Sequence, residues 1–312
     1  MISYILRRLV ALIPVVVFLS LFVFAIMKLT PGDPAALLAG PEASEEVIEL
    51  TRAKYGLDRP WYVQYALMMS NLFSGELESI YYGESVSTLV MQRLPATLQL
   101  GLAALVIALV VAIPAGIIAA IRRNTIFDYA SMGIALFGVS IPVFFTGILL
   151  IYVFAVNLQW LPASGYGGPI WTAEGARHVL MPAFALSLVL MASTTRLTRS
   201  SMLEVMSEDY IRTATAKGAS KSRVVLGHGL RNAFIPILTN IGNQFARLFA
   251  GAVLTETVFA WPGAGRLAIN AIFRRDEPLV LATVLFLGLI YVFVNLFIDI
   301  LYTVINPRIS YE

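Results

Sequence analysis

The chain has 312 residues, of which 58% are hydrophobic and only 13% are charged, and its formal net charge is +3. Soluble domains carry roughly 25% charged residues, so this composition excludes an ordinary soluble protein and predicts one embedded in a membrane. Cysteine is absent, which excludes disulfides and thiolate metal sites. The basic residues do not form the groove-sized patch that nucleic-acid binding requires, so no nucleic-acid partner is expected.

Apolar runs long enough to cross a bilayer recur along the chain. A hydrocarbon core of about 30 Å requires about 20 apolar residues in a helix. Six runs approach this length, of which the fifth is interrupted by Arg247; they are residues 9–27, 98–121, 130–155, 179–195, 233–258 and 279–298. The first is longer than the apolar part of a signal peptide and lacks a small-x-small cleavage site. We therefore expect an all-α integral membrane protein with six spans, the first of them uncleaved.

The basic residues beside these runs predict the orientation, because positively charged loops stay in the cytoplasm. Lys and Arg precede the first run, follow the second, fill the loop after the fourth and follow the sixth. Both termini are therefore expected in the cytoplasm, and the acidic segment 30–94 outside it. One loop contradicts the rule, since it should lie outside and yet contains Arg266, Arg274 and Arg275.

The predicted organisation has four parts along the chain. They are a first transmembrane helix (1–29), a periplasmic segment (30–94), a core transmembrane domain of five helices (95–305) and a cytoplasmic tail (306–312).

Two short helices are predicted inside the periplasmic segment. Ser44 can cap a helix that Gly56 ends, and Pro60 can start another that Gly75 ends. These helices either cover the bundle or, in addition, meet a partner at the outer face.

The loop 200–232 between the fourth and fifth spans is polar, basic and too long for a simple turn. A first helix is predicted there by an N-cap, two acids in the first turn and a C′ glycine, which are Ser207, Glu208, Asp209 and Gly218. Ser220 can then cap a second helix that runs through Leu230. We expect a helix, a glycine corner and a second helix on the cytoplasmic face.

This loop resembles the EAA loop of ABC importer permeases, a helix–glycine–helix element that docks into a cleft of the ATPase. Gly218 matches the glycine of that element and Leu230 its late leucine. The glutamate and two alanines of the family fall on Arg212, Thr213 and Ala214, and Arg231 replaces its proline. The resemblance implies coupling to the ATPase through Glu208, Asp209, Arg212, Thr213, Ala214, Gly218 and Leu230. The alternative is a basic surface held near anionic lipid headgroups.

Further motifs are similar to one branch of these permeases, the dipeptide, oligopeptide and nickel permeases. They include Pro-Gly-Asp-Pro at 31–34, Leu-Pro-Ala-Thr at 94–97, Thr-Arg-Ser-Ser-Met-Leu-Glu-Val at 198–205, Glu-Asp-Tyr-Ile-Arg-Thr-Ala at 208–214, Leu-Arg-Asn at 230–232, Phe-Ala-Trp-Pro-Gly at 259–263 and Asn-Pro-Arg-Ile at 306–309. Their order and spacing cover almost the whole chain.

The resemblance implies a type I importer transmembrane domain in the bacterial inner membrane. Such a chain forms half of the translocation pathway, with a homologous second permease, two ATP-binding subunits and a periplasmic solute-binding protein as partners, and membrane lipid around it. The sequence contains no Gly-x-x-x-x-Gly-Lys-[Ser/Thr] phosphate loop. ATP and Mg are therefore expected in the partner subunits, and no cofactor in this chain.

Polar residues are also present inside the fifth span. They recur at helical steps of three or four and are Asn240, Asn243, Gln244, Arg247 and Gly251. An arginine at mid-bilayer costs about 2.5–3.5 kcal/mol on insertion scales, so this face should not meet lipid. It is interpreted as the wall of the solute pathway. The alternatives for Arg247 are a structural ion pair with Glu256 or Asp299, or packing against a partner subunit.

No motif of an intramembrane enzyme is found, and no catalytic residue or metal site is predicted. His-Glu-x-x-His and Gly-x-Ser-x-Gly are absent, and the two histidines, His178 and His228, lie far apart in the sequence. A secondary transporter or channel also suits six spans, but it does not explain the loop 200–232. Peptides are the first expectation for the solute. Glutathione and nickel or other metal chelates remain alternatives, and residues 158–162 are somewhat similar to nickel permeases.

Overall fold

A computed structural model describes residues 2–40 and 42–305, which contain helices and no strand beyond one isolated bridge between Glu78 and Ser85. The chain divides into two compact units. Unit 1 comprises Met1–Thr97 and Pro262–Val292, and unit 2 comprises Leu98–Trp261 and Phe293–Glu312. Two long helices, α5 and α12, contribute residues to both units.

Unit 1 combines the predicted periplasmic segment (30–94), called the outer segment, with α1, α11 and the starts of α5 and α12. Its elements are α1 (Ile2–Leu29), α2 (Pro34–Ala39), α3 (Glu45–Lys54), α4 (Trp61–Ser74), the start of α5 (Val86–Ile121), α11 (Ala264–Phe273) and the start of α12 (Glu277–Ile305). Side chains from α1, α5, α11 and α12 share one apolar core that includes Val23, Leu89, Leu267 and Leu281. This core joins segments that lie far apart in the sequence.

The capping residues of the outer helices agree with the predictions. The Ser44 hydroxyl accepts from the Val47 N–H at 3.4 Å at the start of α3, and α4 begins directly after Pro60. The glycines that follow both helices, Gly56 and Gly75, have φ of +64° and +79°.

Two of the three arginines in the loop that contradicts the positive-inside rule are held by the outer segment. The Arg274 guanidinium lies over the Tyr81 ring, 3.5 Å from its centroid, and Arg275 donates a hydrogen bond to the Pro31 carbonyl. Cation–π and hydrogen-bonding contacts therefore engage both positive charges within unit 1.

The two acids after these arginines lie at the start of α12. Glu277 pairs with Lys28 at 3.0 Å, and Asp276 accepts hydrogen bonds from the Ser79 hydroxyl and the Leu279 N–H. Burial raises the pKa of the Asp276 carboxyl, although its hydrogen bonds, including one from the Ile80 N–H, act in the opposite direction. These contacts tie the outer segment to the start of α12.

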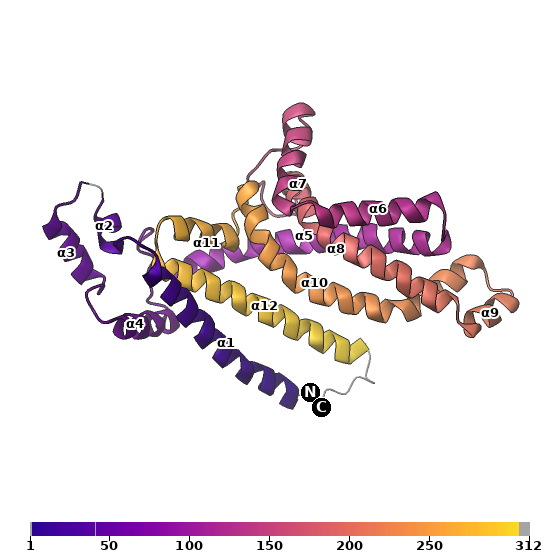
Figure 1. The fold of residues 1–312 in the computed structure, drawn as a ribbon, viewed down its shortest axis with the longest axis horizontal. Helices are drawn as coiled ribbons and strands as arrows, with labels where there is room; N and C mark the ends of the chain where they lie inside the picture. The colour runs from indigo at the N-terminus through magenta and orange to yellow at the C-terminus, as the bar shows by residue number, and fades with distance from the viewer. Residues whose placement is uncertain (1, 41, 306–312) are drawn as a thin grey trace. The chain divides into compact units, whose positions relative to one another are not determined.

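Unit 2 is arranged around one long helix, α8 (Ala173–Met206). This helix packs against α6 (Ile126–Ser140), α7 (Val143–Leu150) and α10 (Arg231–Val258), and in Figure 1 it runs between α6 and α10. A π-helix, η1 (Ile151–Asn157), extends α7.

Helices α5 and α8 approach closely at a glycine. A Cβ atom on Gly116 would lie 2.5 Å from Thr198 Cβ and 2.8 Å from the Thr195 carbonyl oxygen. Small residues allow such backbone approach in membrane helices, where packing rather than burial from water drives association.

Within residues 2–40 and 42–305, four helical segments are long and apolar enough to cross a membrane, by length and composition: Val10–Leu29, Val86–Ile121, Ala173–Met206 and Glu277–Ile298. The expected third span, 130–155, is not one continuous helix. It breaks into α6 and α7 with a bend of 103°. Ile141 has an extended backbone, and Pro142 after it cannot donate the N–H that would continue α6.

Helix α10 has 28 residues and covers the expected fifth span. Because of its polar residues, it is not among the four segments that are apolar enough to cross a membrane. The count of six spans and the cytoplasmic position of both termini therefore stay predictions.

Candidate functional site

The loop after α8 forms a short helix, α9 (Asp209–Ala216). Its N-cap is Glu208 and not the predicted Ser207. Ser207 has helical dihedral angles, and its N–H and hydroxyl both donate to the Glu204 carbonyl at the end of α8. The prediction was wrong because α8 continues to Met206, which makes Ser207 the C-cap residue of α8.

The glycine corner is present where it was predicted. Gly218 follows the C-cap residue Lys217 and has φ of +80°, a left-handed conformation that glycine adopts without a Cβ penalty. The Ser220 hydroxyl then accepts from the Arg223 N–H at 3.4 Å, as expected for a capping residue.

The second helix runs through Leu230, as predicted, but the helical conformation does not stop there. A π-helix, η2 (Arg223–Leu230), continues directly into α10, and both Leu230 and Arg231 have helical dihedral angles. No glycine or proline interrupts the chain between Leu230 and Pro236, so nothing stops the helix there. The predicted cytoplasmic element, which comprises α9, the Gly218 corner and η2, is therefore continuous with α10.

A few buried contacts hold this element against unit 2. Ile211 of α9 and Val224 of η2 are buried, and Leu230 packs against the apolar cluster that contains Met202 and Ile237. Leu230 therefore faces its own subunit.

A hydrogen bond also joins α9 to the start of α10. Asn232 Nδ2 donates to the Tyr210 hydroxyl at 3.0 Å, linking the start of α10 to α9. Both residues lie in motifs that resemble the permease family, at 208–214 and 230–232, but no role was predicted for either.

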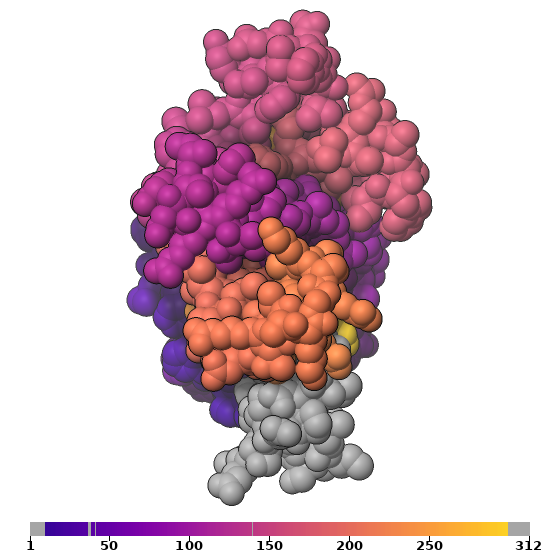
Figure 2. Space-filling model, turned by 90° about the vertical axis from the view of Figure 1, so that its right-hand side faces the viewer, coloured from indigo at the N-terminus to yellow at the C-terminus, as the bar shows by residue number. Residues whose placement is uncertain are grey.

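The opposite face of the loop is open to solvent. Five of the predicted coupling residues are exposed, whereas Ala214 is half-buried; the five are Glu208, Asp209, Arg212, Thr213 and Gly218. Figure 2 shows this end of unit 2, with α9 and η2 in orange on the face turned toward the viewer. Leu226 of η2 adds an apolar side chain with 52% of its surface exposed. Leu226 was not among the predicted coupling residues, and in the sequence it is notable only as an apolar residue within a polar loop.

A buried ion pair anchors the helix that leads into this loop. Arg199 of α8 contacts both carboxylate oxygens of Asp128 in α6, with Nη2 2.7 Å from Oδ2. The Asp128 side chain is 3% exposed and that of Arg199 is 25% exposed, and Asp128 also accepts from the Asn124 N–H at 3.1 Å. The bidentate pair fixes α8 against α6 immediately before residue 200. In the sequence, Arg199 served only as one of the basic residues that predict the orientation of the chain, and no role was predicted for Asp128.

The predicted polar face of α10 is divided between two environments. Asn243 and Arg247 are exposed, and Gln244 is half-buried. Asn240 instead turns toward α8, where its Nδ2 donates to Thr194 Oγ1 at 3.3 Å. Gly251 also faces α8, since a Cβ added there would lie 3.2 Å from Leu186 Cδ1.

Arg247 forms no ion pair with any residue whose side chain the structure describes. Glu256, one expected partner, is buried, and the side chain of Asp299, the other, lies outside the described side chains. The exposed stripe through Asn243 and Arg247 also includes Thr239 and Ala250. A polar stripe of this kind needs a protein or aqueous neighbour instead of lipid.

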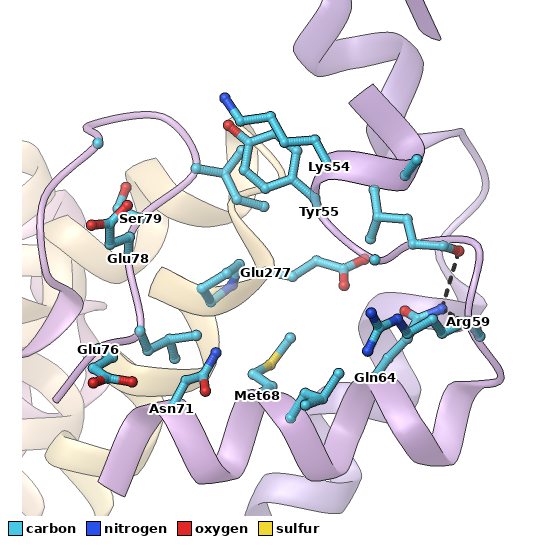
Figure 3. A pocket seen from close by; sticks show the side chains of 18 residues that line it. Lys54, Tyr55, Arg59, Gln64, Met68, Asn71, Glu76, Glu78, Ser79 and Glu277 are labelled. Atoms are coloured by element: carbon cyan, nitrogen blue, oxygen red, sulfur yellow. Dashed lines mark hydrogen bonds between the residues drawn. The ribbon is translucent and has the colours of Figure 1, made fainter. Parts of the chain in front are cut away.

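A mixed polar cavity of about 470 Å³ lies in the outer part of unit 1 (Figure 3). Residues from the end of α3, from α4, from the loop before α5 and from the start of α12 surround it. Basic side chains of Lys54 and Arg59 and acidic side chains of Glu76, Glu78 and Glu277 are among its walls. Within the described residues, no group of three or more His, Cys, Asp or Glu is placed to hold a metal ion.

Two family models together match nearly the whole chain. The model described as "Binding-protein-dependent transport system inner membrane component" matches residues 112–311. The model for the N-terminal part of the same membrane component matches residues 1–101. The chain belongs to this family. It is the inner-membrane permease subunit of an ABC importer, as the resemblance of the loop and motifs implied.

Relatives of this permease match over their full length. The chain is 44% identical over 313 residues to the glutathione transport system permease protein GsiC of Escherichia coli, and it covers 100% of both chains. It is 40% identical over 333 residues to the dipeptide transport system permease protein DppB of Alkalihalophilus pseudofirmus, again with 100% of both chains covered.

Solved structures support the fold of the permease. An inward-facing structure of the MetNI methionine ABC transporter matches with a TM-score of 0.57 and 17% identity, covering 70% of this chain and 96% of the other. An amino acid ABC transporter with histidines matches with a TM-score of 0.51 and 18% identity, covering 72% and 95%.

We expect Asp128→Asn to lower the stability of the permease. The substitution leaves the Arg199 guanidinium without its carboxylate, which should cost about 2 kcal/mol, less than the 3–5 kcal/mol of a fully buried pair because Arg199 is partly exposed. Thermal unfolding of the purified permease in detergent measures the effect.

The matched control is Asp209→Asn, which removes a carboxylate from an exposed pair with Arg212. Exposed pairs contribute little, so its unfolding temperature should stay near that of the wild type. Equal unfolding temperatures for the two variants would contradict a structural role for the Asp128–Arg199 pair.

Proposed function

We propose that this permease forms half of the translocation pathway of an ATP-driven importer of dipeptides and oligopeptides. One observation carries the proposal: α9, the Gly218 corner and η2 form an exposed, braced element in a chain that matches importer permeases from end to end. A secondary transporter would not need such an element.

The proposed solute class is based on the names of the relatives. DppB is named for dipeptide transport and GsiC for glutathione transport, and glutathione is itself a tripeptide. Glutathione is therefore the second candidate, favoured by the somewhat higher identity of 44% against 40%. Nickel or another metal chelate is the remaining alternative from the sequence.

The proposed assembly contains a homologous second permease, two ATP-binding subunits and a periplasmic solute-binding protein. The chain has no phosphate-binding loop, so ATP and Mg would bind the partner subunits, and this chain would hold no cofactor and catalyse no reaction. Six spans with cytoplasmic termini, with the segment 30–94 outside, the core at 95–305 and the tail at 306–312, complete the proposed topology.

The ATP-binding subunit would contact the exposed part of the cytoplasmic element. Glu208, Asp209, Arg212 and Thr213 supply its polar surface, and Leu226 its apolar one. Ala214 and Leu230 would act from within the subunit, because they are less exposed. Since η2 continues into α10, a push on the element would be transmitted along one helix.

The exposed stripe of α10 would face the pathway. Asn243 and Arg247 would contact water, the solute or the second permease, with Gln244 at the margin. Asn240 and Gly251 would keep α10 packed on α8, because both face that helix.

Reconstitution into liposomes tests the proposed function. The permease with its second permease, the ATP-binding subunits and the binding protein should accumulate peptide only when ATP is supplied. Solute uptake by this chain alone, without nucleotide, would refute the importer mechanism.

Gly218→Val is expected to lose peptide uptake with little loss of expression. A Cβ at this position meets no atom within 4 Å, so the change strains the left-handed backbone by about 1–2 kcal/mol without a clash. Gly218→Asn serves as the control, because asparagine tolerates this conformation better than valine. Valine and asparagine variants with equal ATP-coupled uptake would contradict a role for the corner.

Arg247→Ala is expected to reduce uptake without changing assembly, because Arg247 is exposed and unpaired among the described side chains. Arg247→Lys keeps the charge and should retain more activity. Co-purification of the subunits monitors assembly, and unchanged uptake kinetics in the alanine variant would remove Arg247 from the pathway.

A further inference from the structure

Helix α4 (Trp61–Ser74) of the outer segment contains no charged residue. Charged residues stand just outside it, at Arg59 and Glu76. The preceding helix α3 differs, because five of its ten residues are charged. With 14 residues, α4 is too short to cross a bilayer, which requires about 20. Its composition is therefore that of a membrane helix, whereas its length is not.

The contacts between α4 and α1 show which level of α1 the helix adjoins. The Tyr65 hydroxyl lies 2.7 Å from the Ser20 hydroxyl, and the Tyr65 ring meets the Phe24 ring edge-on, with centroids 5.5 Å apart. The apolar span of α1 ends beside the Lys28–Glu277 ion pair. Ser20 and Phe24 precede Lys28 by eight and four residues, so at a rise of 1.5 Å per residue they lie about 12 and 6 Å inside the span. Helix α4 therefore packs beside the apolar part of α1 and not beyond its end.

One side of α4 is polar and faces protein. The Gln64 amide donates to the Leu57 and Arg59 carbonyls at 3.1 and 2.6 Å. Gln64 and Asn71 both line the cavity of about 470 Å³, as Figure 3 shows. The polar groups on this side of α4 therefore face the chain itself or the cavity.

Another side of α4 is apolar and uncovered. Tyr62, Ala66 and Phe73 are exposed, and at 3.6 residues per turn they fall within about 40° of one another around the helix axis. Phe73 has 77% of its surface exposed. Asn71 is two residues from Phe73 and thus projects to nearly the opposite side. Helix α4 is amphipathic, with its uncovered side apolar.

Lipid is the neighbour that fits this apolar side. Only 17% of the apolar window of α1 is buried, so α1 presents most of that window to the bilayer, and α4 packs directly on it. Trp61 and Tyr62 begin the helix, and these residue types gather at the headgroup level. Helices that lie in a membrane surface bury their apolar side about 5–10 Å deep, which agrees with the levels of Ser20 and Phe24.

We propose that α4 lies in the lipid leaflet at the Lys28–Glu277 end of α1, with Tyr62, Ala66 and Phe73 against acyl chains. The outer segment is then divided between two solvents, because the charged helix α3 stays in water. This inference does not depend on the proposed function, since it concerns only how the chain sits in its membrane.

Nitroxide spin labels test this placement, because the chain has no cysteine of its own. The permease carries one cysteine, Phe73→Cys, and is reconstituted in phospholipid nanodiscs with the subunits that co-purify with it. The same complex with the wild-type permease supplies the background signal. Oxygen concentrates in lipid and a nickel chelate stays in water, so power saturation with each reagent measures the surroundings of the label. At residue 73, collisions with oxygen should exceed those with the nickel chelate several-fold.

Two matched positions should give the reverse pattern. Leu50→Cys labels an exposed apolar residue of the charged helix α3, and Asn71→Cys labels the polar side of α4 itself. Ala66→Cys is the milder second variant on the apolar side and should reproduce the result at residue 73.

Frequent nickel collisions at residues 66 and 73, equal to those at residue 50, would place α4 in water and overturn the proposal. Few collisions with either reagent would mean that a protein subunit covers this side, which would also overturn it.

Discussion

Every polar group inside a bilayer must find a partner within protein or water, and this constraint organises the permease. Helix α10 illustrates it most clearly. Its buried side packs against α8, where Asn240 bonds to Thr194, while Asn243 and Arg247 remain on the exposed side. Lipid cannot satisfy that exposed stripe, so the isolated chain presents a surface that is complete only with a partner or an aqueous path.

The same helix continues into the predicted coupling loop. Helix η2 continues into α10 without a break, and α9 is braced by Ile211 and by the Tyr210–Asn232 hydrogen bond. The Asp128–Arg199 pair anchors α8 just before the loop begins. These contacts hold α9, η2 and α8 in fixed positions within unit 2.

In unit 1, contacts with nearby residues determine where several charged side chains lie. Arg275 and Asp276 tie α12 to the outer segment, and Glu277 pairs with Lys28. The positive-inside rule counts charges without regard to such contacts. The contacts of Arg274 and Arg275 show what holds these two positive charges, and the topology stays a prediction.

The sequence by itself determined that this is a membrane protein, that it resembles one family of permeases, and where several helix caps and turns lie. Long apolar runs require a membrane, and the backbone preferences of Ser44, Gly56 and Gly218 act within a few residues, so their positions could be predicted. Tertiary structure alone decided that the Asn232 amide meets the Tyr210 hydroxyl and that Asn240 meets Thr194. It also paired Asp128 with Arg199 and placed Tyr65 against Ser20. These features depend on which helices pack together, and residues that are distant in the chain reveal no such contact in a single sequence.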